Sequence, residues 1–108
     1  MGHSNNVKIV VFVPETHANA VREAMGKAGA GKLGNYSFAS FSCKGIGRFK
    51  PESGAHPAIG HVGNLEAVVE ERIETICPCG LVSDVVAAIR KVHPYEEIAL
   101  DIYSLEEI

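Results

Sequence analysis

The chain has 108 residues, a length typical of one domain rather than two. Hydrophobic residues make up 46% of it and charged residues 21%, which is too apolar for a disordered chain. The chain has ten Lys and Arg residues and 13 Asp and Glu residues. The resulting formal net charge of −3 argues against a nucleic-acid-binding protein. Since no apolar run is long enough to cross a bilayer, we expect a cytoplasmic protein without a membrane or nucleic-acid partner.

The first half of the chain predicts two strands and a helix. Residues 1–6 are polar and are expected to be a disordered tail or a cloning remnant, so that one domain occupies residues 7–108. The β-branched run 7–13 predicts a strand. Apolar residues at helical spacing predict a helix over 16–28, and a second strand is expected over 36–50, followed by a loop over 51–64 that is rich in Pro and Gly.

The second half of the chain predicts a strand, a helix and a last strand. Residues 66–76 mix polar and apolar side chains, but their β-branched content favours a strand. An amphipathic pattern predicts a helix over 81–92, and alternating residues predict a last strand over 98–103. The order βαββαβ is that of a ferredoxin-like α+β sandwich, with a four-stranded antiparallel sheet and two helices on one face.

The first strand suggests that copies of the chain associate. Two helices can cover only one face of the sheet, yet Val10 and Phe12 make the other face of this strand apolar as well. A second copy of the chain is the simplest cover for that face, so we expect a homo-oligomer.

Charged and metal-ligating residues offer further candidate sites, each with a plainer alternative. His56 and His61 lie five residues apart in the expected loop and could face one metal ion, but surface histidines without a complete ligand set are the favoured interpretation. Lys44, Arg48 and Lys50 would share a face of a regular strand and could hold a small anion, whereas a solvated sheet edge is the alternative.

Adjacent carboxylates at Glu96 and Glu97 invite an acid–base interpretation. In an extended segment their side chains would point to opposite faces, so we do not expect them to share a substrate. No arrangement of nucleophile and base is forced by the sequence, and no cofactor is expected.

Several short motifs together resemble one family, the inserted domain of the Nif-three-like (YqfO-type) dinuclear-metal proteins. The resemblance covers residues 7–105 and is carried by His93-Pro-Tyr-Glu-Glu97 with Asp101-Ile-Tyr103, and by Val11–Pro14, Gly29–Gly31, Gly34–Ser37, Gly45–Pro51, Ile59-Gly60 and Arg72–Thr75. The His-Pro-Tyr-Glu segment is also similar to the signature of CutA, which shares its fold with the PII signalling proteins.

The resemblance implies a homotrimer, because CutA and PII proteins are trimers of this unit. It also implies that the two metals of the full-length family are held by flanking halves that this sequence does not contain. A non-enzymatic binding or scaffolding domain is therefore expected, with a divalent-metal-binding protein of CutA type and a small metal-dependent hydrolase as alternatives. Its expected ligand or interface residues are His93, Tyr95, Glu96, Glu97, Tyr36, Lys44, Gly45, Gly47, Arg48 and Lys50.

The same resemblance suggests roles for the His93 motif. His93 at the end of the second helix would be favoured in its protonated form by the helix dipole and could bond a free carbonyl. Tyr95 would pack its ring in the turn and direct its hydroxyl to a partner subunit. One of Glu96 and Glu97 would face the subunit boundary.

Overall fold

The computed structural model describes residues 2–108. The elements follow one another as β1 (His3–Pro14), the 3-10 turn η1 (Glu15–His17), α1 (Ala18–Lys27), β2 (Phe41–Phe49), β3 (Glu66–Pro78), the 3-10 turn η2 (Cys79–Leu81), α2 (Val82–Val92) and β4 (Leu100–Glu106). No helix within residues 2–108 is long and apolar enough to cross a membrane.

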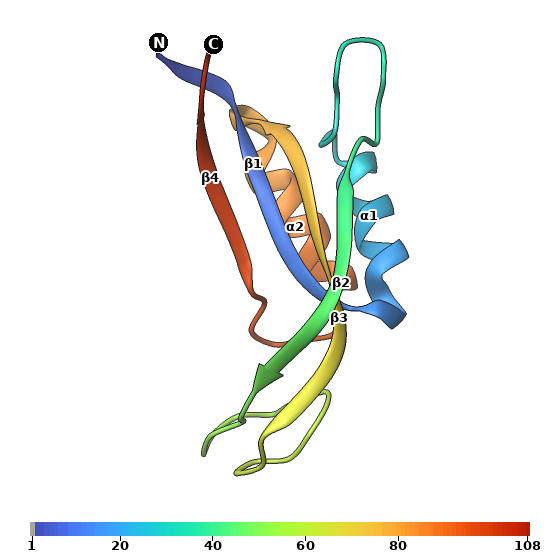
Figure 1. Ribbon diagram of the computed structural model, residues 1–108, viewed down its shortest axis with the longest axis vertical. Coiled ribbons are helices and arrows are strands. Elements are labelled where there is room, and N and C mark those ends of the chain that lie inside the picture. Colours follow the sequence, from blue (N-terminus) through green and yellow to red (C-terminus); the bar gives the residue numbers. More distant parts are fainter. Residues whose placement is uncertain (1) are drawn as a thin grey trace.

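All four strands belong to one sheet in the order β2-β3-β1-β4, and every neighbouring pair is antiparallel. Both helices pack on the same side of this sheet (Figure 1). The ferredoxin-like α+β fold predicted from the sequence is therefore confirmed.

The core lies between the sheet and the two helices. Ile9, Val11 and Val13 of β1 point into it, as the period of two along a strand requires. They meet residues from the apolar stripes of the helices, among them Val21 of α1 and Ile89 of α2, all fully buried. The helices are thus held by burial of one face each, in the way predicted from their spacing.

The sheet face away from the helices is less apolar than predicted. Val10 has no exposed surface, although no helix lies over it. Its neighbours on this face include Arg72, whose guanidinium lies 5.6 Å from the centre of the Phe12 ring and 3.2 Å from Glu74. The chain's own charged side chains thus flank this strand, and burial of Val10 does not require a second copy.

Element boundaries differ from the prediction at two places. β1 begins at His3, so the expected disordered tail is wrong for His3–Asn6, which join the sheet; Met1 lies outside the described residues. β2 begins at Phe41 rather than at Tyr36, because Tyr36 closes a turn over Gly34 and Asn35, where it exchanges backbone hydrogen bonds with Leu33, and residues 37–40 belong to no strand.

One end of the sheet extends beyond the body of the molecule. β1 pairs with β3 only as far as Glu70, so the outer parts of β2 and β3 and their connection, residues 46–69, continue as a two-stranded projection. We call residues 46–69 the β2–β3 arm; it occupies the lower end of the molecule in Figure 1. At the opposite end the backbone N–H of Glu107 donates to the carbonyl of Gly2 at 2.9 Å.

Candidate functional site

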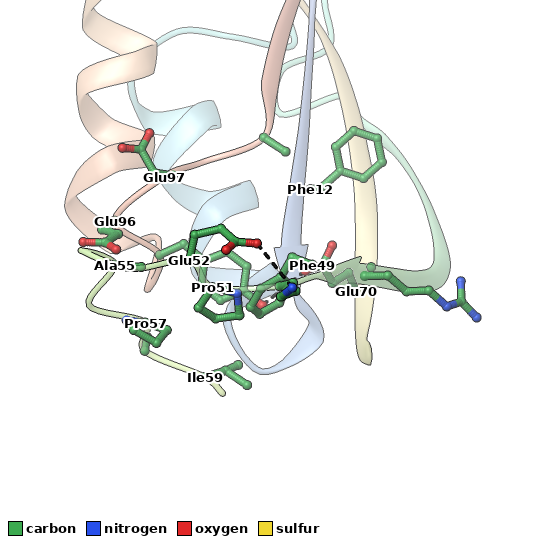
Figure 2. Close-up of a pocket in the computed structure, with 16 residues that line it drawn as sticks. Phe12, Phe49, Pro51, Glu52, Ala55, Pro57, Ile59, Glu70, Glu96 and Glu97 are labelled. Carbon is green, nitrogen blue, oxygen red and sulfur yellow. Dashed lines mark hydrogen bonds and ion pairs between the residues drawn. The ribbon is translucent and has the colours of Figure 1, made fainter. Parts of the chain in front are cut away.

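A cavity of about 530 Å³ lies where the β2–β3 arm meets the segment between α2 and β4. Its walls are mostly apolar, and in Figure 2 the loop residues Ala55, Pro57 and Ile59 lie across it from Phe12 of β1. Its charged residues are four carboxylates and two basic residues, and Tyr95 adds a hydroxyl group. We call this space the Glu70 cavity; it is lined by Phe12, Gly47, Arg48, Phe49, Lys50, Pro51, Glu52, Ala55, Pro57, Ala58, Ile59, Glu70, Tyr95, Glu96, Glu97 and Ala99.

His93 fixes the segment that leads from α2 to β4. Its Nδ1 accepts a hydrogen bond from the backbone N–H of Tyr95 at 3.1 Å, so Nε2 carries the ring proton and donates it to the Phe12 carbonyl at 2.8 Å. The ring is 7% exposed. Burial lowers the pKa of His93. The residue therefore acts as a neutral structural bridge, and the protonated form favoured from the sequence is wrong.

Tyr95 and Glu70 form the polar centre of the cavity. The Tyr95 hydroxyl donates to Oε2 of Glu70 at 3.2 Å, and its ring packs edge-on against Phe49, with centroids 5.7 Å apart. Burial, together with the negative charge of Glu70, raises the pKa of Tyr95 to about 12. The phenol consequently stays protonated and donates to Glu70 within the same chain.

Gly47 allows the carboxylate of Glu70 to lie against β2. A Cβ placed on Gly47 would come within 2.2 Å of Oε1 of Glu70, a contact that no side chain accepts without displacement. The two glycines of β2 were expected to mark a bulge or a close approach. The β2–β3 register runs without a shift, and the close approach at Gly47 is by this carboxylate.

Glu96 and Glu97 both line the cavity, although alternation predicted opposite faces. The prediction is wrong because the chain bends at these two residues instead of staying extended. Glu96 accepts a hydrogen bond from the backbone N–H of His56 at 2.8 Å and so ties the loop to the α2–β4 segment. Figure 2 shows Glu96 beside Ala55.

The basic residues proposed to hold an anion do not gather in one place. Lys44 lies 3.3 Å from Glu15, on the helix side of the sheet, and does not line the cavity. Lys50 does line it, at 3.7 Å from Glu52. Arg48 lines it as well, but strand alternation directs its side chain to the face opposite to Gly47 and Phe49.

The remaining candidates lie apart from this centre. Tyr36 is exposed in the turn before β2, and nothing lies within 4 Å of a Cβ placed on Gly45. His56 and His61 are exposed on the loop. Among residues 2–108 no group of three or more His, Cys, Asp or Glu side chains could hold a metal ion. The described residues therefore supply no donor set that would complete a metal site at His56 and His61.

Sequence reasoning missed Glu70, Phe12 and Phe49 as site residues. Glu70 is only 8% exposed, and it contacts a tyrosine 25 residues further along the chain. Its position in a strand, on the face that the helices leave open, was the available signal. That signal did not reveal the contact, because the bend at Glu96–Glu97 that brings Tyr95 over the sheet was not predicted.

Comparison of the sequence with known proteins gives close relatives, although no family model matches. The chain is 58% identical over 98 residues to the GTP cyclohydrolase 1 type 2 homolog of Halalkalibacterium halodurans. The aligned region covers 91% of this chain and 26% of that protein. It is 51% identical over 100 residues to the homolog of the same name in Bacillus subtilis, covering 93% and 27%. The chain thus spans about a quarter of the length of these relatives.

Solved structures agree with the sequence comparison. The Bacillus cereus protein related to NIF3 matches with a TM-score of 0.84 and 48% identity, over 99% of this chain and 27% of that one. CutA from Archaeoglobus fulgidus matches with a TM-score of 0.69 at 14% identity, over 95% and 86% of the two chains, which shows a shared fold. Bacillus subtilis GlnK matches with a TM-score of 0.55 at 17% identity, over 97% of this chain and 87% of the GlnK chain. The chain is therefore similar to a segment that makes up about a quarter of these relatives and of the NIF3-related protein, and it has the CutA/PII-like fold predicted from the His93 motif.

Proposed function

We propose that this chain is a non-enzymatic, homotrimeric binding domain that acts in the cytoplasm and takes up its ligand in the Glu70 cavity. The observation that carries the proposal is the cavity itself, whose volume of about 530 Å³ lies within the range of small-molecule sites. Mostly apolar walls with a few converging polar groups are typical of binding sites. The cavity residues described above serve binding rather than catalysis, because His93 has both ring nitrogens engaged with the backbone and Tyr95 stays protonated.

The sheet edges support the trimer. β2 and β4 are the two edge strands, and each leaves a row of backbone groups without a neighbouring strand within the chain. An interface between β2 of one copy and β4 of the next would use two different surfaces, and such head-to-tail contacts close into a ring when the rotation permits. The trimers implied by the CutA/PII resemblance are consistent with such a ring.

The β2–β3 arm gives a second argument for association. Ile46 and Val69 are paired across its strands and are 49% and 43% exposed, and Leu65 at its tip is 82% exposed. A two-stranded projection with apolar side chains in water is marginally stable by itself. Packing of this arm on a neighbouring copy would bury those side chains and bring the adjacent cavity close to a subunit boundary.

The cysteines agree with the proposed compartment. Cys43, Cys77 and Cys79 are all free thiols, and two of them are exposed. Exposed free thiols persist in a reducing environment, whereas oxidising compartments favour disulfides.

The experiment that tests the proposal measures the mass of the purified chain in solution. Sedimentation equilibrium and native mass spectrometry at micromolar concentration should both give three chains per particle. A stable monomer over that range would contradict the proposed assembly. Incubation with nucleoside triphosphates and phosphate esters, with and without Mn²⁺, should give no turnover, and metal-dependent hydrolysis would show that the chain is an enzyme.

A further inference from the structure

The carboxylate of Glu70 lines the cavity and has fewer hydrogen-bond partners than an ionised group can accept. Among residues 2–108 it receives one side-chain hydrogen bond, from the neutral hydroxyl of Tyr95 at 3.2 Å. An ionised carboxylate has about four acceptor sites, so most of those of Glu70 remain open toward the cavity. Oε1 lies against Gly47, which supplies no side chain. Glu70 is thus suited to receive a positively charged donor from a ligand.

Most charged residues around the cavity have the same sign as Glu70. Four carboxylates line it, at Glu52, Glu70, Glu96 and Glu97, against two basic residues. Lys50 is already near Glu52, and alternation turns the side chain of Arg48 to the other face of the sheet. Carboxylates therefore outnumber basic groups two to one in the lining, which favours a cation over the small anion that the sequence suggested.

The walls restrict what kind of cation fits. A bare metal ion needs several oxygen or nitrogen ligands. Among the described residues, no three His, Cys, Asp or Glu side chains are placed so that they could hold one ion together. Phe12, Phe49 and Pro51 instead present apolar surface over most of the cavity, and aromatic rings also attract organic cations. An apolar body with one charged donor would satisfy both the walls and Glu70.

We propose that the Glu70 cavity binds a small organic ammonium compound with an apolar or aromatic body, its charged group against the Glu70 carboxylate. This proposal rests on the proposed function, since it names the ligand class of the same cavity. The ammonium group donates to Oε1 and Oε2, the Tyr95 hydroxyl keeps its bond to Oε2, and the body lies against Phe12 and Phe49.

The test compares three probes of nearly equal size, 2-phenylethylamine, 2-phenylethanol and 3-phenylpropionate, by NMR titration of the full chain at neutral pH. The amine should bind about tenfold or more tightly than the alcohol, with the carboxylate weakest, as expected for a charge-assisted hydrogen bond. Glu70→Gln keeps the shape of the side chain and should remove this preference. Glu106→Gln, which removes an exposed carboxylate at the opposite end of the sheet, should change the affinity by less than about twofold.

Tyr95→Phe provides a second variant in case Glu70→Gln alters the fold. It removes the neutral donor and leaves the carboxylate free, so the affinity for the amine should be kept or increased. Equal binding of amine and alcohol, an unchanged preference in Glu70→Gln, or no binding of the amine at millimolar concentration would each overturn the proposal. The oligomer measurement stands apart from this result: a trimer without amine preference removes only the ligand class, and a monomer that prefers the amine removes only the assembly.

Discussion

His93 makes two hydrogen bonds that only its neutral form can make together. A proton on Nδ1 would prevent this nitrogen from accepting the hydrogen bond of the Tyr95 backbone N–H. Burial also disfavours the charged ring. The neutral ring thus holds the end of α2 to the backbone of β1 at Phe12. Through Tyr95 the same bridge positions the donor to Glu70, so the shape of the cavity depends on the protonation state of one histidine.

We expect the stability of the protein to fall in mild acid because of His93. Its folded pKa is below the ordinary value of 6.5, so above that pH the ring is neutral in both states and its contribution is complete. Below pH 6.5 the unfolded chain takes up a proton that the folded chain resists. The free energy of unfolding should therefore decrease by up to about 1.4 kcal/mol per pH unit until the folded pKa is reached.

Urea unfolding at several pH values measures this dependence. His93→Gln keeps an amide donor near the Phe12 carbonyl but cannot titrate, so this part of the pH dependence should disappear. His61→Gln removes an exposed histidine and should retain the wild-type profile. A His93→Gln protein with the wild-type slope between pH 6.5 and 5 would assign the effect to another group.

At the residue scale the sequence revealed part of the site. The His93 motif was found through its resemblance to a family, and Tyr95, Glu96 and Glu97 do line the cavity. Glu70 was missed because its partner is distant in the chain, and strand alternation says nothing about which loop folds over a strand. The local pattern also grouped Lys44 with Arg48 and Lys50. In the structure Lys44 instead forms an ion pair with Glu15.

At the level of elements, the turn after α1 depends on Gly31. Its φ is +87°, and its N–H donates to the Ile76 carbonyl of β3 at 2.7 Å, while its own carbonyl accepts from Ala39 at 2.9 Å. A Cβ here would lie 2.6 Å from the backbone oxygen of Ala39, which cannot move aside as a flexible side chain can. The residue joins the end of α1 to β3 and to the segment before β2.

Gly31→Ala should therefore destabilise the fold by about 1–3 kcal/mol, because it adds strain at a positive φ and a contact with rigid backbone. Chemical denaturation measures the change. Gly45→Ala is the matched control, since that glycine has no positive φ and open space around its Cα, and it should shift stability by less than about 0.5 kcal/mol. Equal effects of the two substitutions would contradict this account of Gly31.

Element type was predictable where the periodicity was strong, and boundaries were less so. The apolar residues that the pattern assigned to the core are buried in α1, in α2 and in the β-branched part of β1. β1 nevertheless begins at the polar segment His3–Asn6, because backbone pairing with β3 and β4 does not require apolar side chains. Residues 36–40 have strand-like composition but form an irregular segment between the turn at Gly34 and Asn35 and the start of β2.

For the whole molecule, the β2–β3 arm offers a direct test of association. Ile46→Lys with Val69→Lys places two charges on its exposed apolar pair and should convert a trimer into monomers while circular dichroism stays unchanged. The substitution removes the apolar area that a neighbour would bury and sets like charges opposite each other. Analytical ultracentrifugation reads the result.

Ala20→Lys with Ala87→Lys adds the same charge to exposed positions of α1 and α2, and this variant should keep the wild-type mass. If the arm variant also remained trimeric, the arm would not be part of the interface. The sheet edges at β2 and β4 would then be the remaining surfaces for contact between copies.

The hydrogen bond between Gly2 and Glu107 has a consequence for how such a domain combines with others. Both ends of the chain leave the sheet side by side, at the end opposite to the β2–β3 arm (Figure 1). A host protein could therefore accept the whole unit in a single surface loop, without its own backbone having to bridge a gap. Architecture of this kind lets one sequence be carried within a chain about four times as long, as in the relatives, while its cavity lies at the base of the arm, away from the two ends of the chain.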